Sequence, residues 1–100
     1  MTRYERAPLG STATVTVRLP ALLLDLFPGA RRDVVVQATS VREVMDELDR
    51  LWPGMRDRLC DTRPAIRKHI NVFVDGERVK LASPLAPGAT VWVLTAISGG

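Results

Sequence analysis

The chain has 100 residues, of which 46% are hydrophobic and 25% are charged, and its formal net charge is +3. These values are ordinary for a single globular domain and leave little room for a deep catalytic cleft beside a core. No apolar run is long enough to span a bilayer, no secretory signal is recognisable, and the basic residues are scattered rather than gathered in a stripe. We therefore expect no membrane partner and no nucleic-acid partner. The single cysteine, Cys60, cannot form an internal disulfide, which favours a cytoplasmic location.

The first part of the chain predicts two strands. Residues 1–12 show no hydrophobic periodicity, so we expect a flexible leader before the folded domain. Apolar residues alternate with polar ones over 13–19, which is typical of a half-buried strand. A short apolar turn at 21–27 separates it from VVVQA at 34–38. Because these two strands are close in sequence, we expect them to pair antiparallel.

The middle of the chain carries the clearest helix. Ser40 and Glu43 form a capping-box pattern, in which each side chain satisfies an amide of the first turn. An apolar stripe at helical spacing follows, made of Val41, Val44, Met45, Leu48, Leu51 and Trp52. Pro53-Gly54 ends the helix. A short helical segment is expected at 55–60, and then a loop through Pro64.

The last part of the chain predicts a hairpin and a final strand. In INVFVDGERVKL, residues 70–81, Asp75-Gly76 favours a type I′ turn. After a connection rich in Pro and Gly, TVWVLTAI at 90–97 is the last strand. The order of elements predicts an α+β domain over 13–97, a β-grasp fold in which one main helix covers one face of a mixed sheet of four to five strands. Residues 98–100 are expected to form a flexible tail.

The strand patterns also predict what lies on the uncovered face of the sheet. If Val72 faces the core, its neighbour Phe73 faces outward, and Asn71 marks that same side as wet. If Val91 and Val93 face the helix, the residues between and after them face outward. We expect an exposed apolar patch that consists of Phe73, Trp92 and Leu94. A register shifted by one residue would instead bury Trp92 in the core.

Few side chains in the sequence suggest catalysis. His69 and Cys60 are the only histidine and cysteine, and neither belongs to a recognisable catalytic or metal-binding motif. We interpret His69 as a surface or hydrogen-bonded residue and Cys60 as a packed thiol. The composition predicts that the chain is not an enzyme and binds no metal.

The final residues, Ser98, Gly99 and Gly100, suggest a different kind of chemistry. Glycine has no Cβ, so a backbone ending in two glycines can pass through a channel too narrow for side chains. Such a tail could deliver its terminal carboxylate to the active site of another protein. A free carboxylate is a poor electrophile and must first be activated, most simply as an acyl-adenylate.

The predicted topology, the NVFVDGE segment of the hairpin and the terminal Gly-Gly resemble the ThiS/MoaD family of sulfur-carrier proteins over about residues 14–100. The resemblance implies that a ubiquitin-activating-type enzyme uses ATP to adenylate Gly100, which then becomes a thiocarboxylate and donates sulfur to a synthase. It implies no cofactor bound to the carrier itself. Gly99 would thread the channel. The partner-binding residues would be Phe73, Trp92, Leu94, Ile97 and Ser98.

The resemblance leaves the destination of the sulfur open. The length of the chain and the segment 40–64 resemble the MoaD and cysteine-biosynthesis carriers more than the shorter thiamin type. We expect a carrier for cysteine or for a sulfur-containing metabolite. The alternatives are a small subunit of molybdopterin synthase and a ubiquitin-like protein modifier. A further alternative is an interaction module whose terminal glycines have no function.

Overall fold

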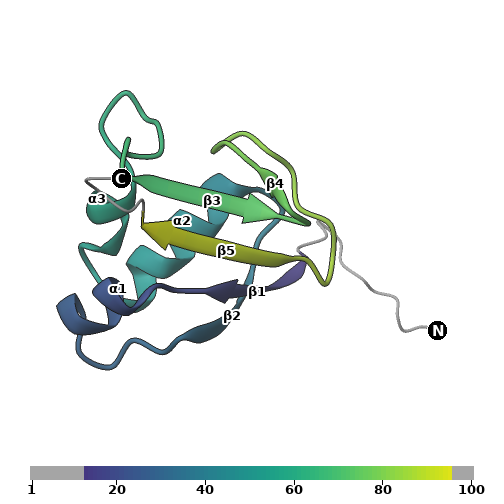
Figure 1. Ribbon diagram of the computed structural model, residues 1–100. Coiled ribbons are helices and arrows are strands. Elements are labelled where there is room, and N and C mark those ends of the chain that lie inside the picture. Colours follow the sequence, from purple (N-terminus) through teal and green to yellow (C-terminus); the bar gives the residue numbers. More distant parts are fainter. Residues whose placement is uncertain (1–12, 96–100) are drawn as a thin grey trace.

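The computed structural model describes residues 13–95, which form a five-stranded mixed sheet with the helices on one side (Figure 1). The expected leader, 1–12, the last two residues of the final predicted strand and the expected tail, 98–100, lie outside these residues. The elements are β1 (Thr14–Arg18), α1 (Ala21–Leu26), β2 (Asp33–Gln37), α2 (Val41–Leu51), α3 (Met55–Leu59), β3 (Ile70–Val74), β4 (Glu77–Arg78) and β5 (Thr90–Thr95).

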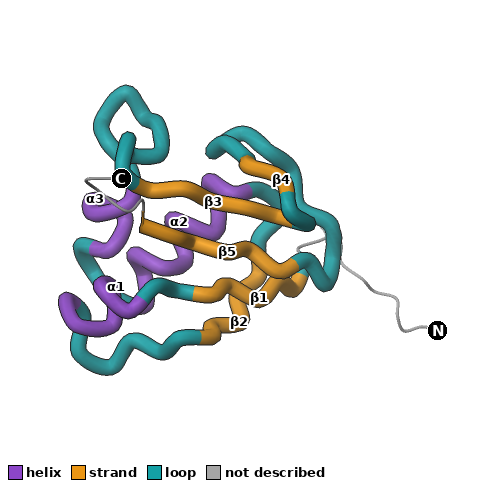
Figure 2. The backbone as a smooth tube through the Cα atoms, in the orientation of Figure 1, coloured by secondary structure: helices purple, strands orange, loops and turns teal. Residues whose placement is uncertain are grey.

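The strand order in the sheet is β2-β1-β5-β3-β4. β1 pairs antiparallel with β2, as the sequence predicts, and parallel with β5. β3 pairs antiparallel with both β5 and β4. The last strand of the chain therefore lies in the middle of the sheet, and α2 passes behind it in Figure 2. This is the predicted β-grasp arrangement.

The core lies between α2 and the inner face of the sheet. Alternate residues of every long strand are buried there, and Val17, Val72, Val91 and Val93 are inaccessible to solvent. The predicted apolar stripe of α2 supplies the other side, with Val41, Val44, Met45 and Leu48 fully buried. Burial of these side chains is the main favourable contribution to folding.

The stripe ends earlier than the sequence pattern predicts. Leu51, the last residue of α2, is 37% exposed, and Trp52 is the C-cap and only half-buried. The prediction that Leu51 belongs to the buried stripe is therefore wrong. The short helix α3 packs against α2, and its Met55 and Leu59 are fully buried. These two side chains complete this part of the core in place of Leu51.

The start of α2 is capped in a way that differs in detail from the predicted capping box. The Ser40 Oγ accepts a hydrogen bond from the Glu43 amide at 3.2 Å, as expected. The Glu43 carboxylate, however, accepts from the amide and hydroxyl of Thr39, at 2.6 and 2.9 Å, rather than from Ser40. Thr39 offers two donors where Ser40 would offer one. These bonds stabilise the ionised form and lower the pKa of Glu43.

The β3–β4 hairpin has the predicted turn. Asp75 and Gly76 both have positive φ, 53° and 80°, which is the requirement of a type I′ turn. β4 has only two residues, because the chain beyond Val79 leaves the sheet to meet the start of α2. The Arg42 amide donates to Leu81 O at 2.9 Å, so this connection satisfies a backbone donor of the first helical turn.

We expect Leu48→Ala to lower the free energy of unfolding by about 2–5 kcal/mol, because it leaves a cavity under α2. Leu51→Ala, in the same helix and with the same atoms removed, is the matched control and should cost less than about 1 kcal/mol. Urea denaturation of the two variants measures the difference. Equal losses would contradict the assignment of Leu51 to the surface.

Candidate functional site

The outer face of the sheet is the face that no helix covers. Cross-strand pairing places five side chains in one row across it. Arg18 is paired with Asp33 on β2 and with Trp92 on β5, and Trp92 is paired with Phe73. Phe73 is paired in turn with Arg78 on β4. The row therefore has Trp92 and Phe73 at its centre and charged residues at both ends.

Trp92 and Leu94 are each 42% exposed, while their neighbours Val91 and Val93 are fully buried on the inner face. Phe73 is half-buried between its partners in the row. The predicted orientation of these strands is therefore confirmed, and the register shifted by one residue is excluded. We call Phe73, Trp92 and Leu94 the outer-face patch.

The patch is bordered by a charged pair that the sequence analysis missed. The guanidinium carbon of Arg18 lies 4.8 Å from the centroid of the Trp92 ring, which is a favourable cation–π distance. The Nε atom of Arg18 lies 3.7 Å from Oδ1 of Asp33, an ion-pair distance that is too long for a hydrogen bond. Arg18 therefore lies over the indole ring and helps to fix its orientation.

Val35 also lies on the outer face and is 64% exposed, the largest value among the exposed large hydrophobic residues in the described part of the chain. It pairs with Thr16 on β1 and so lies in the row next to that of Trp92. The sequence contained a signal for it, because the middle residue of VVV in a strand must face away from the other two.

The strand that carries Trp92 and Leu94 also leads toward the terminal glycines. β5 ends at Thr95, which pairs with Ile70 at the beginning of β3. Ile97, Ser98, Gly99 and Gly100 lie outside the described residues, so their predicted roles stay predictions. Two of the three residues of the outer-face patch, Trp92 and Leu94, are thus on the strand that leads toward the predicted tail.

The two candidate nucleophiles are not assembled into a catalytic site. His69 is exposed just before β3, and Cys60 is buried at the end of α3. Burial raises the pKa of the Cys60 thiol, against the opposing effect of Arg56 nearby. Within residues 13–95, no group of three or more His, Cys, Asp or Glu side chains is placed to hold a metal ion. No helix of the described region has the length and apolar character needed to cross a membrane.

Comparison with known proteins identifies relatives for this fold. The model of the ThiS family matches residues 17–100. Among solved structures, one chain of the BexX/CysO complex of Amycolatopsis orientalis is 29% identical, with a TM-score of 0.77 over 86% of this chain and 99% of that one. CysO of Mycobacterium tuberculosis, described as an antigen, is 27% identical, with a TM-score of 0.76 over 83% and 99%. SAMP1 of Haloferax volcanii is 25% identical, with a TM-score of 0.73 over 88% and 100%. Among curated proteins, no sequence matches.

We expect Trp92→Ala to change the free energy of unfolding by no more than about 1 kcal/mol, because much of the ring already contacts water. Val93→Ala, the next residue on the same strand, removes fully buried atoms and should cost about 2 kcal/mol or more. Thermal and urea denaturation of both variants test this contrast. A greater loss for Trp92→Ala than for Val93→Ala would show that the indole ring supports the fold.

Proposed function

Because this chain belongs to the ThiS family of sulfur carriers and ubiquitin-like modifiers, we propose that it carries sulfur as a thiocarboxylate on Gly100. The observation that carries the proposal is that the family match extends through both terminal glycines. The chain would act in the cytoplasm as a protein cosubstrate rather than as an enzyme.

The proposed chemistry takes place in two steps on the terminal carboxylate. A carboxylate oxygen of Gly100 attacks the α-phosphorus of ATP on an adenylating enzyme, which forms an acyl-adenylate and releases pyrophosphate. A sulfide equivalent then attacks the carbonyl carbon, and AMP leaves with the electron pair of the broken C–O bond. One oxygen has been replaced by sulfur, and the thiocarboxylate can pass that sulfur to the acceptor of a synthase.

The proposed recognition uses the outer-face patch together with the tail. Trp92 and Leu94 are exposed on a rigid central strand, and aromatic side chains of this kind often dominate binding at interfaces. Ile97 and Ser98 would seat the tail at the entrance of the partner's channel, and Gly99 would pass through it. Docking on the sheet would hold the start of the tail at a fixed place on the partner's surface. The tail then has to span a fixed distance for Gly100 to reach the partner's active site.

The sulfur acceptor that we favour is a synthase for cysteine or for a sulfur-containing metabolite. The likeness to two CysO structures supports this choice over the other members of the family. A second candidate function is protein modification, in which a lysine amine accepts the acyl group. The likeness to the small archaeal modifier protein SAMP1 is the observation that favours it.

We expect the intact mass of the full chain to rise by about 16 Da on incubation with ATP, a sulfide source and an adenylating enzyme from the same organism. The gain corresponds to replacement of one carboxylate oxygen by sulfur. A variant that lacks Gly100 should show no gain under the same conditions.

The enzyme must first be shown to be active on another carrier. With that control in place, an unchanged mass of the full chain would contradict the proposed function. Isopeptide-linked conjugates on lysines of other proteins, formed without any thiocarboxylate, would support the modifier instead.

We expect Trp92→Ala to weaken docking to the adenylating enzyme by about 30-fold, or about 2 kcal/mol, if the ring is buried in the interface. In the adenylation assay, KM for the carrier should rise while kcat changes little, because the reacting carboxylate is unaltered. Leu22→Ala is a suitable control, since Leu22 is another exposed large hydrophobic residue but lies on α1. An unchanged KM for Trp92→Ala would show that the outer-face patch does not take part in docking to this enzyme.

A further inference from the structure

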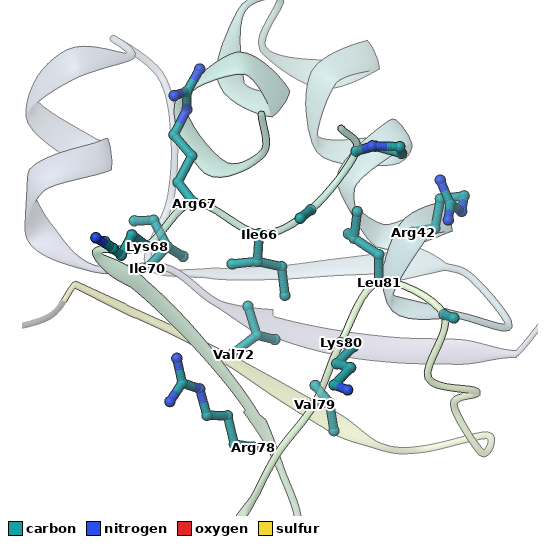
Figure 3. Close-up of a pocket in the computed structure, with 13 residues that line it drawn as sticks. Arg42, Ile66, Arg67, Lys68, Ile70, Val72, Arg78, Val79, Lys80 and Leu81 are labelled. Atoms are coloured by element: carbon teal, nitrogen blue, oxygen red, sulfur yellow. The ribbon is translucent and has the colours of Figure 1, made fainter. Parts of the chain in front are cut away.

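A second surface feature lies on the helix side of the sheet, beside the part of β3 that β4 does not pair with. It is a pocket of about 670 Å³ between the start of α2, the loop before β3 and the chain that follows β4 (Figure 3). Its volume is within the range of ordinary ligand pockets. We call it the β3-edge pocket, and it is lined by Arg42, Pro64, Ala65, Ile66, Arg67, Lys68, Ile70, Val72, Arg78, Val79, Lys80, Leu81 and Ala82.

One wall of the pocket is held open by the early departure of the chain from the sheet after β4. The Val79 amide still donates to Val72 O at 2.9 Å, but the next residues turn toward α2. The Lys80 amide donates to Ser83 Oγ at 2.9 Å, and the Arg42 amide donates to Leu81 O, also at 2.9 Å. Beyond Val79, this wall is therefore attached to the first turn of α2 rather than to β3.

The opposite wall is a loop organised by Asp61. Its Oδ1 atom accepts hydrogen bonds from the amides of Arg63 and Ala65, both at 3.0 Å. The Arg63 guanidinium bonds Oδ2. The side-chain hydrogen bond from Arg63 and those from the backbone lower the pKa of Asp61 to about 2. Beyond the loop, the Arg67 amide donates to Leu59 O at 2.8 Å. Both walls are thus fixed by hydrogen bonds within the chain.

The interior of the pocket is apolar. Ile66 extends into it from the loop and points toward Val72 of β3 in Figure 3. Val72, Ile70 and Leu81 are themselves buried and form the base of the pocket, whereas Ile66 and Val79 are only half-buried and expose apolar surface to it. An apolar side chain from another molecule could therefore be buried here against Ile66 and Val79.

The rim of the pocket is basic. Five of the lining residues are cationic and none is acidic. Arg67 donates to the backbone oxygen of Asp57. The other four, Arg42, Lys68, Arg78 and Lys80, take part in no ion pair within residues 13–95. The rim therefore concentrates uncompensated positive charge around an apolar centre.

We propose that the β3-edge pocket binds an acidic segment of a partner protein, with an apolar side chain in the pocket and flanking carboxylates on the rim. The charge of the rim requires an anionic occupant. The arrangement of the cations favours a peptide over a phosphate, because in Figure 3 they stand on different sides of the apolar centre rather than converging on one point. A chain with acids on either side of a leucine matches this layout.

The pocket adjoins the outer-face patch through Arg78. This residue lines the pocket and is paired across the strands with Phe73. A partner bound to the outer face could therefore continue around the edge of the sheet into the pocket. The inference rests on the proposed function only in that a carrier needs protein partners, and the binding test below does not involve the chemistry of Gly100.

The test is an NMR titration of the full chain, labelled with ¹⁵N, with a blocked synthetic peptide of sequence Glu-Asp-Leu-Asp-Glu. We expect saturable shifts of the amide signals of Ile66, Val72 and Leu81. The peptide Gln-Asn-Leu-Asn-Gln should bind at least about tenfold more weakly, as should Glu-Asp-Ser-Asp-Glu. Raising the ionic strength from about 0.02 M to about 0.3 M should weaken the binding of the acidic peptide more than that of the uncharged peptide, since salt screens exposed charges.

Matched charge reversals locate the binding site. The double variant Arg42→Glu/Lys80→Glu should bind the acidic peptide at least about tenfold more weakly. Arg32→Glu/Arg58→Glu changes the net charge equally at two exposed residues that do not line the pocket and should have little effect. If the first variant fails to fold, Lys80→Gln replaces it, with a smaller expected loss.

Three results would overturn the proposal. The first is the absence of shifts at the pocket, and the second is equal binding by the two charge-reversal variants. The third is tighter binding of ATP or inorganic phosphate than of the acidic peptide, which would assign the pocket to a small anion. None of these outcomes bears on whether Gly100 forms a thiocarboxylate, so the two proposals fail separately.

Discussion

The packing of α2 on only one face of the sheet is the constraint on which the rest of the structure depends. Its apolar stripe is matched to the inner residues of the strands, and together they form most of the core, which Leu23 of α1 and Met55 and Leu59 of α3 complete. One helix of eleven residues, Val41–Leu51, cannot also cover the other face. Trp92 and Leu94 are exposed as a direct result, although both lie on a central strand. The surface that we assign to docking is therefore exposed because the core is formed on the other face of the sheet.

The same constraint accounts for the β3-edge pocket. The first turn of α2 has backbone donors that need partners, and the residues after β4 leave the sheet to supply them. Their departure opens the space beside β3 in which the apolar pocket forms. The capping of α2 and the proposed binding site thus both result from the path of the chain after β4. The outer-face patch and the pocket lie on opposite sides of the sheet but meet at β4, where Arg78 lines the pocket and pairs with Phe73 of the patch.

Local patterns in the sequence were sufficient to predict the elements, their order and the two faces of the sheet. Alternation in β3 and β5 placed Phe73, Trp92 and Leu94 correctly, because the period of a strand is fixed by its pleat. The exposure of Leu51 could not be predicted, since it depends on α3 packing against α2. Nor could the position of Arg18 over Trp92, because it depends on the parallel pairing of strands that are far apart in sequence. The pocket likewise combines segments that no local pattern connects.

The central position of β5 has a mechanical consequence. A partner that draws in the tail pulls on β5 along the axis of the strand, and the hydrogen bonds to β1 and β3 run across that axis. The force therefore acts in shear on many hydrogen bonds at the same time. Peeling away an edge strand would instead break its hydrogen bonds one after another. The sheet can resist traction at its C-terminal end while the fold stays intact, so this strand is well suited to serve as an anchor.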